Sequence, residues 1–137
     1  MIFEYLQERF GIPPDAFKDF QIYGGSKGKV YLGPKKLISK PDIVSLGILV
    51  ARAESSVKPT TNLLQLFGHL ASKNIVRLDK KEAVSFAKGE DLQIKDEASD
   101  GYVLVKFENN CLGCGLLKEN LLINQIPKAK RQQVKYI

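Results

Sequence analysis

Residues 101–126 read GYVLVKFENNCLGCGLLKENLLINQI and contain three consecutive stretches that predict β-strands. GYVLVKF is rich in β-branched and aromatic residues, and Asn109-Asn110 predicts a turn at its end. CLGCGLL then returns as an antiparallel partner, and NLLINQI supplies a further strand. Short strands in such close succession predict a small, barrel-like and mostly antiparallel β-unit.

The sequence just before these strands predicts one more strand and a helix. IVRL, at 75–78, has the composition of a short strand. Asp79 and Glu82 follow with the spacing of a capping box, so a helix is expected to begin here, run to about Lys88 and stop at Gly89. An acidic linker starting at Glu90-Asp91 then leads to the strands, and we expect its carboxylates to be solvated.

The opening of the chain predicts a helix followed by a β-hairpin. Phe3, Leu6 and Phe10 recur at helical spacing, and Gly11 ends the pattern. A further short turn of helix is expected at Pro14-Asp15. FQIYGGSKGKVYLG, at 20–33, predicts the hairpin. Its glycines fit neither the Walker nor the dinucleotide pattern, so the hairpin is favoured over a phosphate-binding loop.

A strand and a second helix complete the first part of the chain. The apolar, β-branched stretch Ile43–Ala53 predicts a buried strand. Pro59 to Asn62 supply a helix-start signal. The apolar helical face that follows consists of Leu63, Leu64, Phe67, Leu70 and Ala71. The whole chain is therefore predicted to be α+β, with a second unit beginning near Asn74.

The chain carries a formal net charge of +6, from 21 Lys and Arg against 15 Asp and Glu in 137 residues. After Pro127, Lys128, Lys130, Arg131 and Lys135 occur without any acidic residue. A basic balance favours polyanionic partners, because binding them releases condensed counterions. The signal is modest, since many basic proteins gain only solubility from such a charge.

Neither a membrane span nor a targeting sequence is evident. No apolar run approaches the roughly 18–20 residues that cross a bilayer. The N-terminal residues MIFEYLQERF include early acids and lack a basic stretch followed by an apolar one, so they do not form a signal peptide. We therefore expect a cytoplasmic protein with no membrane partner.

Residues with catalytic or metal-binding chemistry are few. Cys111 and Cys114 form a C-x-x-C, which is half of a zinc site or one redox pair, but the only histidine, His69, is distant in sequence. In a flat strand, residues three apart point to opposite faces unless a bulge intervenes. Two small, buried apolar side chains are the favoured interpretation. No common enzyme motif occurs, so we predict no catalytic residues, no metal and no cofactor.

Four short patterns in the second unit carry a family resemblance. They are F-x-x-G-E-D at Phe86–Asp91, G-Y-V-L-V at Gly101–Val105, L-G-x-G at Leu112–Gly115, and Pro127-Lys128. This part resembles the PUA-type RNA-binding domain appended to rRNA cytosine methyltransferases of the NOL/NOP/Fmu group. The chain lacks the glycine-rich and catalytic cysteine motifs of those enzymes, so the resemblance implies RNA binding without the methyltransferase chemistry.

The first part resembles the pre-PUA domain of small ribosome-maturation factors of the Nip type. Val30–Leu32, Val44–Gly47 and Asn62–Ala71 occur in the same order as that domain's VYL strand, V-S-L-G strand and apolar helix. Together the resemblances imply a pre-PUA-like domain over residues 1–72 and a PUA-like β pseudobarrel with an inserted helix over 73–137. They also imply that the protein binds structured RNA, either rRNA or tRNA, in ribosome biogenesis or RNA modification.

The predicted RNA-binding residues are basic, aromatic or glycine: Lys58, Lys88, Tyr102, Lys106, Gly113, Gly115, Lys128, Lys130 and Arg131. The cations would contact phosphates, with Lys58 opening the helix after the long strand. Tyr102 shares a strand face with Lys106 and either stacks on a splayed base or packs in the core. The two glycines allow a close approach either of RNA or of a neighbouring strand.

A different class of function remains open from the sequence. The chain is alternatively a protein-interaction adaptor in a ribosome-assembly or rRNA methylation complex. Its partner would then be an RNA-modifying enzyme or a ribosome-assembly factor, and its RNA binding would be weak and sensitive to salt.

Overall fold

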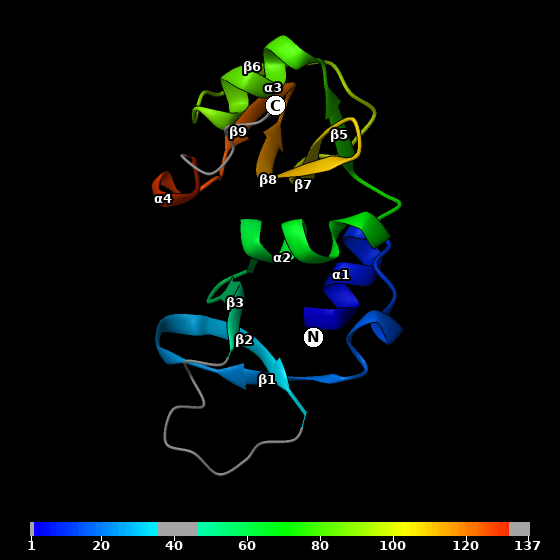
Figure 1. Cartoon of the computed structure of the whole chain (residues 1–137), viewed down its shortest axis with the longest axis vertical. Helices are drawn as coiled ribbons and strands as arrows, with labels where there is room; N and C mark the ends of the chain where they lie inside the picture. The colour runs from blue at the N-terminus through cyan, green and yellow to red at the C-terminus, as the bar shows by residue number, and fades with distance from the viewer. Residues whose placement is uncertain (1, 36–46, 132–137) are drawn as a thin grey trace.

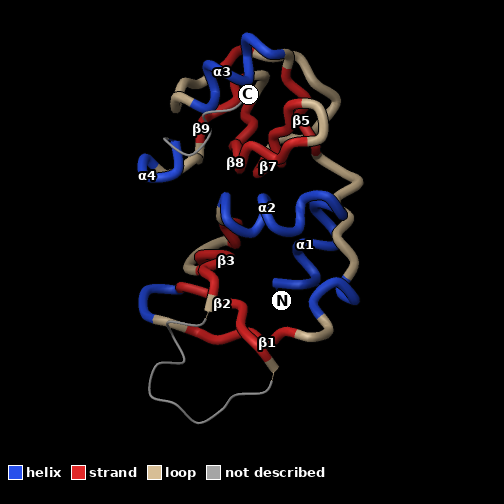
Figure 2. Tube along the Cα trace, in the orientation of Figure 1, coloured by secondary structure: helices blue, strands red, loops and turns tan. Residues whose placement is uncertain are grey.

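The computed structural model describes residues 2–35 and 47–131, which form two β-sheets with a helix between them. Figure 1 shows α2 (Thr61–Phe67) crossing the middle of the molecule, with one sheet on either side of it. The sheet of the first part has the strand order β1-β2-β3-β4, and that of the second part has the order β5-β7-β8-β9-β6. Figure 2 shows that the two sheets are separate layers.

The first part contains the predicted helix and hairpin. Its elements are α1 (Ile2–Phe10), η1 (Pro14–Phe17), β1 (Phe20–Gly24), η2 (Ser26–Gly28), β2 (Lys29–Pro34), β3 (Ile48–Ala53) and β4 (Val57–Pro59). The predicted stripe of α1 buries Leu6 and Phe10, and the helix ends at Gly11, whose φ of 70° favours glycine. Strands β1 and β2 pair antiparallel, with Ile22 opposite Leu32, so the hairpin is confirmed.

Strand β3 differs from the buried strand expected over Ile43–Ala53. Residues 43–46, and with them most of the V-S-L-G segment, lie outside the described residues. Within β3 only Val50 and Ala51 are buried, whereas Ile48 and Arg52 are exposed. The strand is therefore half-buried, because it lies between β2 and β4 in an open sheet rather than in an enclosed one.

Helix α2 begins as predicted but ends earlier. The Thr60 hydroxyl accepts a hydrogen bond from the Leu63 amide at 3.2 Å and donates one to the Leu49 carbonyl at 2.8 Å. The helix ends at Phe67 and tightens into a 3₁₀ turn, η4 (Gly68–Leu70), so Leu70 is 39% exposed instead of continuing the apolar face. A Cβ on Gly68 would lie 2.9 Å from Cys111 Sγ, which shows how closely this turn packs on the second sheet.

The second part is a curled half-barrel with an inserted helix. Its elements are β5 (Ile75–Leu78), α3 (Lys80–Ala87), β6 (Leu92–Gln93), β7 (Gly101–Phe107), β8 (Asn110–Lys118), β9 (Leu121–Asn124) and α4 (Lys128–Arg131). The β5–β7 pair is parallel and the other pairs are antiparallel. The capping box is confirmed, with Asp79 and Glu82 each accepting from the other's backbone amide, at 2.8 and 3.0 Å. The predicted α+β fold is therefore confirmed.

One hydrophobic core joins the two sheets. This first cluster contains Phe10 from α1, Val50 from β3 and Leu64 from α2, and it continues to Leu104 of β7 and Cys114 of β8. A second cluster lies within the half-barrel, between α3 and the strands. Because the first cluster draws on both parts, α2 is packed from both sides. The expected domain boundary between residues 72 and 73 stays a prediction.

None of the helices in the described ranges has the length and apolar character that crossing a bilayer requires.

Candidate nucleic-acid interface

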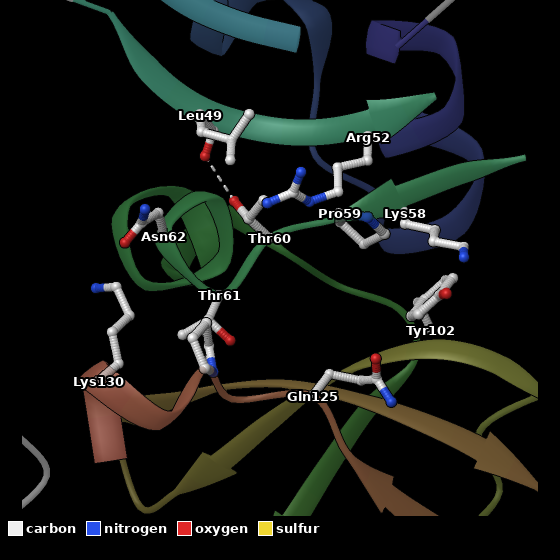
Figure 3. A pocket seen from close by; sticks show the side chains of 11 residues that line it. Leu49, Arg52, Lys58, Pro59, Thr60, Thr61, Asn62, Tyr102, Gln125 and Lys130 are labelled. Atoms are coloured by element: carbon white, nitrogen blue, oxygen red, sulfur yellow. Dashed lines mark hydrogen bonds between the residues drawn. The ribbon is translucent and has the colours of Figure 1, made fainter. Parts of the chain in front are cut away.

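A cleft of about 210 Å³ lies where the first sheet faces the half-barrel. Figure 3 shows it closely, with β3 and α2 on one side and the half-barrel on the other. The lining residues are Leu49, Arg52, Lys58, Pro59, Thr60, Thr61, Asn62, Tyr102, Gln125, Pro127 and Lys130. Residues from both parts of the chain therefore build this cleft together.

The charged lining of the cleft is entirely basic. It consists of Arg52 in β3, Lys58 in β4 and Lys130 in α4, and no described Asp or Glu lines the cleft. Lys58 lies within a short strand, so the expectation that it opens the following helix is wrong. Arg52 and Lys58 are directly opposite each other across β3 and β4. Like charges in such a pair are destabilising by themselves, and an anion bound between them would remove this cost.

Lys130 is held at the opposite end of the cleft from Tyr102 (Figure 3). Its Nζ donates to Gln65 Oε1 at 3.1 Å, and Gln65 Nε2 donates to the Leu112 carbonyl at 3.1 Å. These bonds connect α4, α2 and β8. An ammonium group has three donors, so Lys130 keeps two for a ligand.

The Tyr102 side chain contacts both the hydrophobic core and the cleft. Its half-buried ring packs against the first core cluster and also lines the cleft. Burial raises the pKa of its phenol, and the neighbouring Cys114 raises it further. The Tyr102 carbonyl accepts a hydrogen bond of 2.7 Å from Arg9 Nε, and Arg9 Nη2 donates to the Ser99 carbonyl at 2.6 Å. Helix α1 therefore holds the segment of β7 that presents this ring.

The other exposed cations of the predicted set lie apart from the cleft lining. Lys88 is exposed at the end of α3, and Lys128 is exposed at the start of α4. Arg131 is half-buried, and its Nε donates to the Ile126 carbonyl at 3.0 Å. Its guanidinium covers Gly89, where a Cβ would lie 2.6 Å from Cζ. Arg131 is thus engaged in holding α4 against the half-barrel.

Three of the predicted residues are buried in this structure, and their contact with RNA stays a prediction. Lys106 is only 9% exposed. A Cβ on Gly113 would lie 2.9 Å from Thr61 Oγ1 and Ile126 Cγ1, and one on Gly115 would lie 2.5 Å from Leu122 Cδ1. The close approach that these glycines permit is made by the protein's own side chains.

A β-bulge in β8 explains how the two cysteines are placed. Val105 pairs with Gly113 but Lys106 pairs with Cys111, so β8 has an extra residue at Leu112. Cys111 and Cys114 consequently both pack against the first core cluster, which is the exception that a bulge makes to the rule of opposite faces. Burial raises the pKa of both thiols, that of Cys114 to about 12. Among the described residues, no three His, Cys, Asp or Glu side chains come together as metal ligands would.

Sequence reasoning therefore found three of the cleft residues, Lys58, Tyr102 and Lys130, and missed others. Arg52 was overlooked because it belongs to a stretch whose composition predicts a buried strand. A lone arginine inside such a stretch is a usable signal, since a buried strand tolerates an unpaired charge poorly. Asn62 and Gln125 have no such signal, because single amides occur throughout the sequence.

The fold and the cleft define a small α+β protein with a half-barrel and a basic groove. Comparison with known proteins narrows this class of protein further. Residues 73–132 match the family model described as the methyltransferase RsmF PUA domain, so this part of the chain is similar to a PUA domain. A solved structure titled "Structure of a Conserved PUA Domain Protein from Thermoplasma acidophilum" has a similar fold. The TM-score is 0.55 at 16% identity, and the match covers 98% of this chain and 79% of that one. No curated protein matches the chain. PUA domains are RNA-binding modules and are not themselves catalytic.

Proposed function

We propose that this chain is a non-catalytic RNA-binding protein that holds structured RNA, either rRNA or tRNA, in ribosome biogenesis or RNA modification. The observation that carries the proposal is the cleft between the two sheets, whose charged lining is Arg52, Lys58 and Lys130 alone among the described residues. Cations gathered in one groove attract a polyanion and position its backbone. Lys88 and Lys128 would add phosphate contacts at the periphery.

The test is fluorescence anisotropy with labelled rRNA stem-loops, unstructured RNA and duplex DNA over about 50–300 mM salt. We expect tightest binding to the structured RNA. The Arg52→Gln, Lys58→Gln and Lys130→Gln triple variant should flatten the plot of log affinity against log salt. Each lost phosphate contact lowers the slope by about 0.7–0.9, so the slope should fall by about 2–3 in the triple variant.

The matched control removes the same number of charges from the far side of the half-barrel. Lys80 and Lys81 on α3 and Lys95 after β6 are exposed, and none of them lines the cleft. Their triple Gln variant has the same net charge as the cleft variant. Equal losses in both variants would mean that the RNA responds to total charge, and the cleft would then not be the binding site.

A second candidate is a protein-interaction adaptor with a partner such as an RNA-modifying enzyme or a ribosome-assembly factor. Strand β1 is at an edge of its sheet, and its Phe20 and Ile22 are 36% and 37% exposed. An edge strand with exposed apolar side chains is suited to a protein partner. Crosslinking of a tagged chain in cells tests this, because the Phe20→Ser and Ile22→Ser double variant should lose its partner and keep its RNA affinity.

A further inference from the structure

A row of three cations crosses the first sheet on one face. Lys29 of β2 is directly opposite Arg52 of β3, and Arg52 is directly opposite Lys58 of β4. Residues paired in this way project from the same face of the sheet, with neighbouring strands about 4.8 Å apart. The row is therefore about 10 Å long, and it places like charges side by side twice. Such a row is unfavourable in the free protein and becomes favourable when phosphates lie along it.

Two cavities meet at this row. Arg52 and Lys58 line the cleft and also a second cavity of about 170 Å³ at the β3–β4 turn. The second cavity adds Lys27, Ser55 and Ser56, together with one acid, Glu54. An RNA strand that leaves the cleft thus has a continuous path over the first sheet, with Lys and Arg side chains beside most of it.

The interior of the cleft has a different chemistry from the row. Tyr102 offers an aromatic ring at one end, and Leu49 and Pro59 offer apolar surface. Asn62 and Gln125 lie on opposite sides, and no side-chain hydrogen bond joins either amide to another described residue. Each amide can both donate and accept, as the edge of a nucleobase requires.

The size of the cleft fits a single base better than a helix. One water needs about 10–15 Å³ of such space, so a volume of about 210 Å³ accepts on the order of ten non-hydrogen atoms. That is the size class of one nucleobase. Bases in a duplex are stacked and paired, so only an unpaired nucleotide can turn its base into the cleft.

We propose that the cleft binds one unpaired nucleotide of the RNA, with its base stacked at Tyr102 and its edge bonded by Asn62 and Gln125. The phosphates that follow it lie along Lys58, Arg52 and Lys29 toward the second cavity. The inference rests on the proposed RNA-binding function and narrows it, because the ligand is a bulged or single-stranded segment and the first part of the chain binds it directly.

The experiment compares two RNA hairpins that differ by one unpaired nucleotide. One carries a single 2-aminopurine bulge flanked by paired stems, and the other is fully paired. We expect the wild-type protein to prefer the bulged hairpin by about 10-fold, the scale of one stacked base. The 2-aminopurine fluorescence should fall on binding as its base stacks on Tyr102. An unchanged signal, or equal affinity for the two hairpins, would overturn the proposal.

Two variants separate stacking from folding. Tyr102→Phe keeps the ring and should keep the preference for the bulged hairpin, whereas Tyr102→Leu should remove it. Urea unfolding of Tyr102→Leu establishes that the variant is folded at the assay temperature. If Tyr102→Leu were to unfold, removal of both amides by Asn62→Ala and Gln125→Ala should reduce the same preference. Retained discrimination in these folded variants would refute the base contact.

A matched pair of substitutions tests the predicted phosphate contacts along the row of three cations. Lys29→Gln should weaken binding of the bulged hairpin about 3- to 10-fold, the effect of one phosphate contact, and Lys80→Gln on α3 should not. The measurements also distinguish a failure of the unpaired-nucleotide site from a failure of the RNA-binding function. Salt-sensitive RNA binding without discrimination between the hairpins refutes the unpaired-nucleotide site and leaves the RNA-binding function standing. An absence of RNA binding refutes both.

Discussion

Leu104 is one of the residues through which the two sheets share their core, so truncating it tests whether the chain unfolds as one unit. Its side chain is fully buried in the first cluster, opposite α2. A Cβ on Gly68 would lie 3.0 and 3.1 Å from its two methyl groups, so this turn packs closely on the Leu104 side chain. Leu104→Ala would leave a cavity between rigid elements that cannot close it.

The expected loss follows from that packing. Truncation of a buried leucine to alanine costs about 2–5 kcal/mol, depending on how far the site collapses. Because Gly68 and β8 hold this site open, we expect about 3–4 kcal/mol. With a urea dependence of about 2 kcal/mol per M, the unfolding midpoint should fall by about 1.5–2 M. Leu66→Ala is the matched control, since Leu66 is 48% exposed and the chemical change is the same. It should shift stability by less than about 1 kcal/mol.

The assay is urea unfolding followed by circular dichroism and by hydrogen exchange resolved to α1 and to β8. A shared core predicts one transition, with both segments losing protection together in Leu104→Ala. Two separate transitions, or an α1 whose protection does not change, would refute the reasoning. The two parts would then be independently stable, and the Leu104 contact would not couple them.

Three further perturbations test local features of the structure. Asp79→Ala should lower the free energy of unfolding by about 1 kcal/mol because it removes the capping box of α3, and Asp79→Asn should retain most of it in the same urea titration. Gly113→Ala should cost about 1–3 kcal/mol, because φ is 155° there and a Cβ meets protein atoms on both sides. Gly24→Ala, where a Cβ has nothing within 4 Å, is its control, and equal effects on thermal stability would contradict the packing. The Cys114 thiol, with a pKa raised to about 12, should resist iodoacetamide at pH 8 in the folded protein and react in urea, as mass spectrometry can follow. Its raised folded-state pKa stabilises the native state fully below the thiol's ordinary pKa near 9, and this contribution is lost as pH rises toward about 12. Rapid alkylation of Cys114 in the folded protein would contradict its burial.

Elements held by contacts between near neighbours were predictable from the sequence. The apolar stripe of α1 that contains Leu6 and Phe10 can be recognised from helical spacing alone. The capping box of α3 joins Asp79 and Glu82, which are only three residues apart. The hairpin of β1 and β2 closes over the short η2 turn. The fold of the second part also followed from a family resemblance, which the match of residues 73–132 bears out.

The binding site was predictable only in part, because its residues depend on pairing between distant strands. The register of β7 and β8 shifts at one bulge, and that shift sets Lys106 opposite Cys111. The alternation rule predicts that Lys106 and Tyr102 share a face, but it does not say what covers that face, and composition does not reveal where a bulge falls. Where α2 ends, Gly68 packs closely on Cys111 and Leu104, and these contacts between distant residues are equally hidden from local patterns.

The amino-acid sequence by itself determined where α1, α2 and α3 begin, the hairpins, the basic charge and the family resemblance of the second part, since each depends on local spacing or on a short pattern. The tertiary structure decided which cations face one another. Arg52 and Lys58 become a pair through the register of β3 and β4, and Lys130 joins them only because α2 packs between the two sheets. Contacts between residues so far apart in the chain depend on how both sheets bury their apolar faces against one helix, and no local pattern encodes that arrangement.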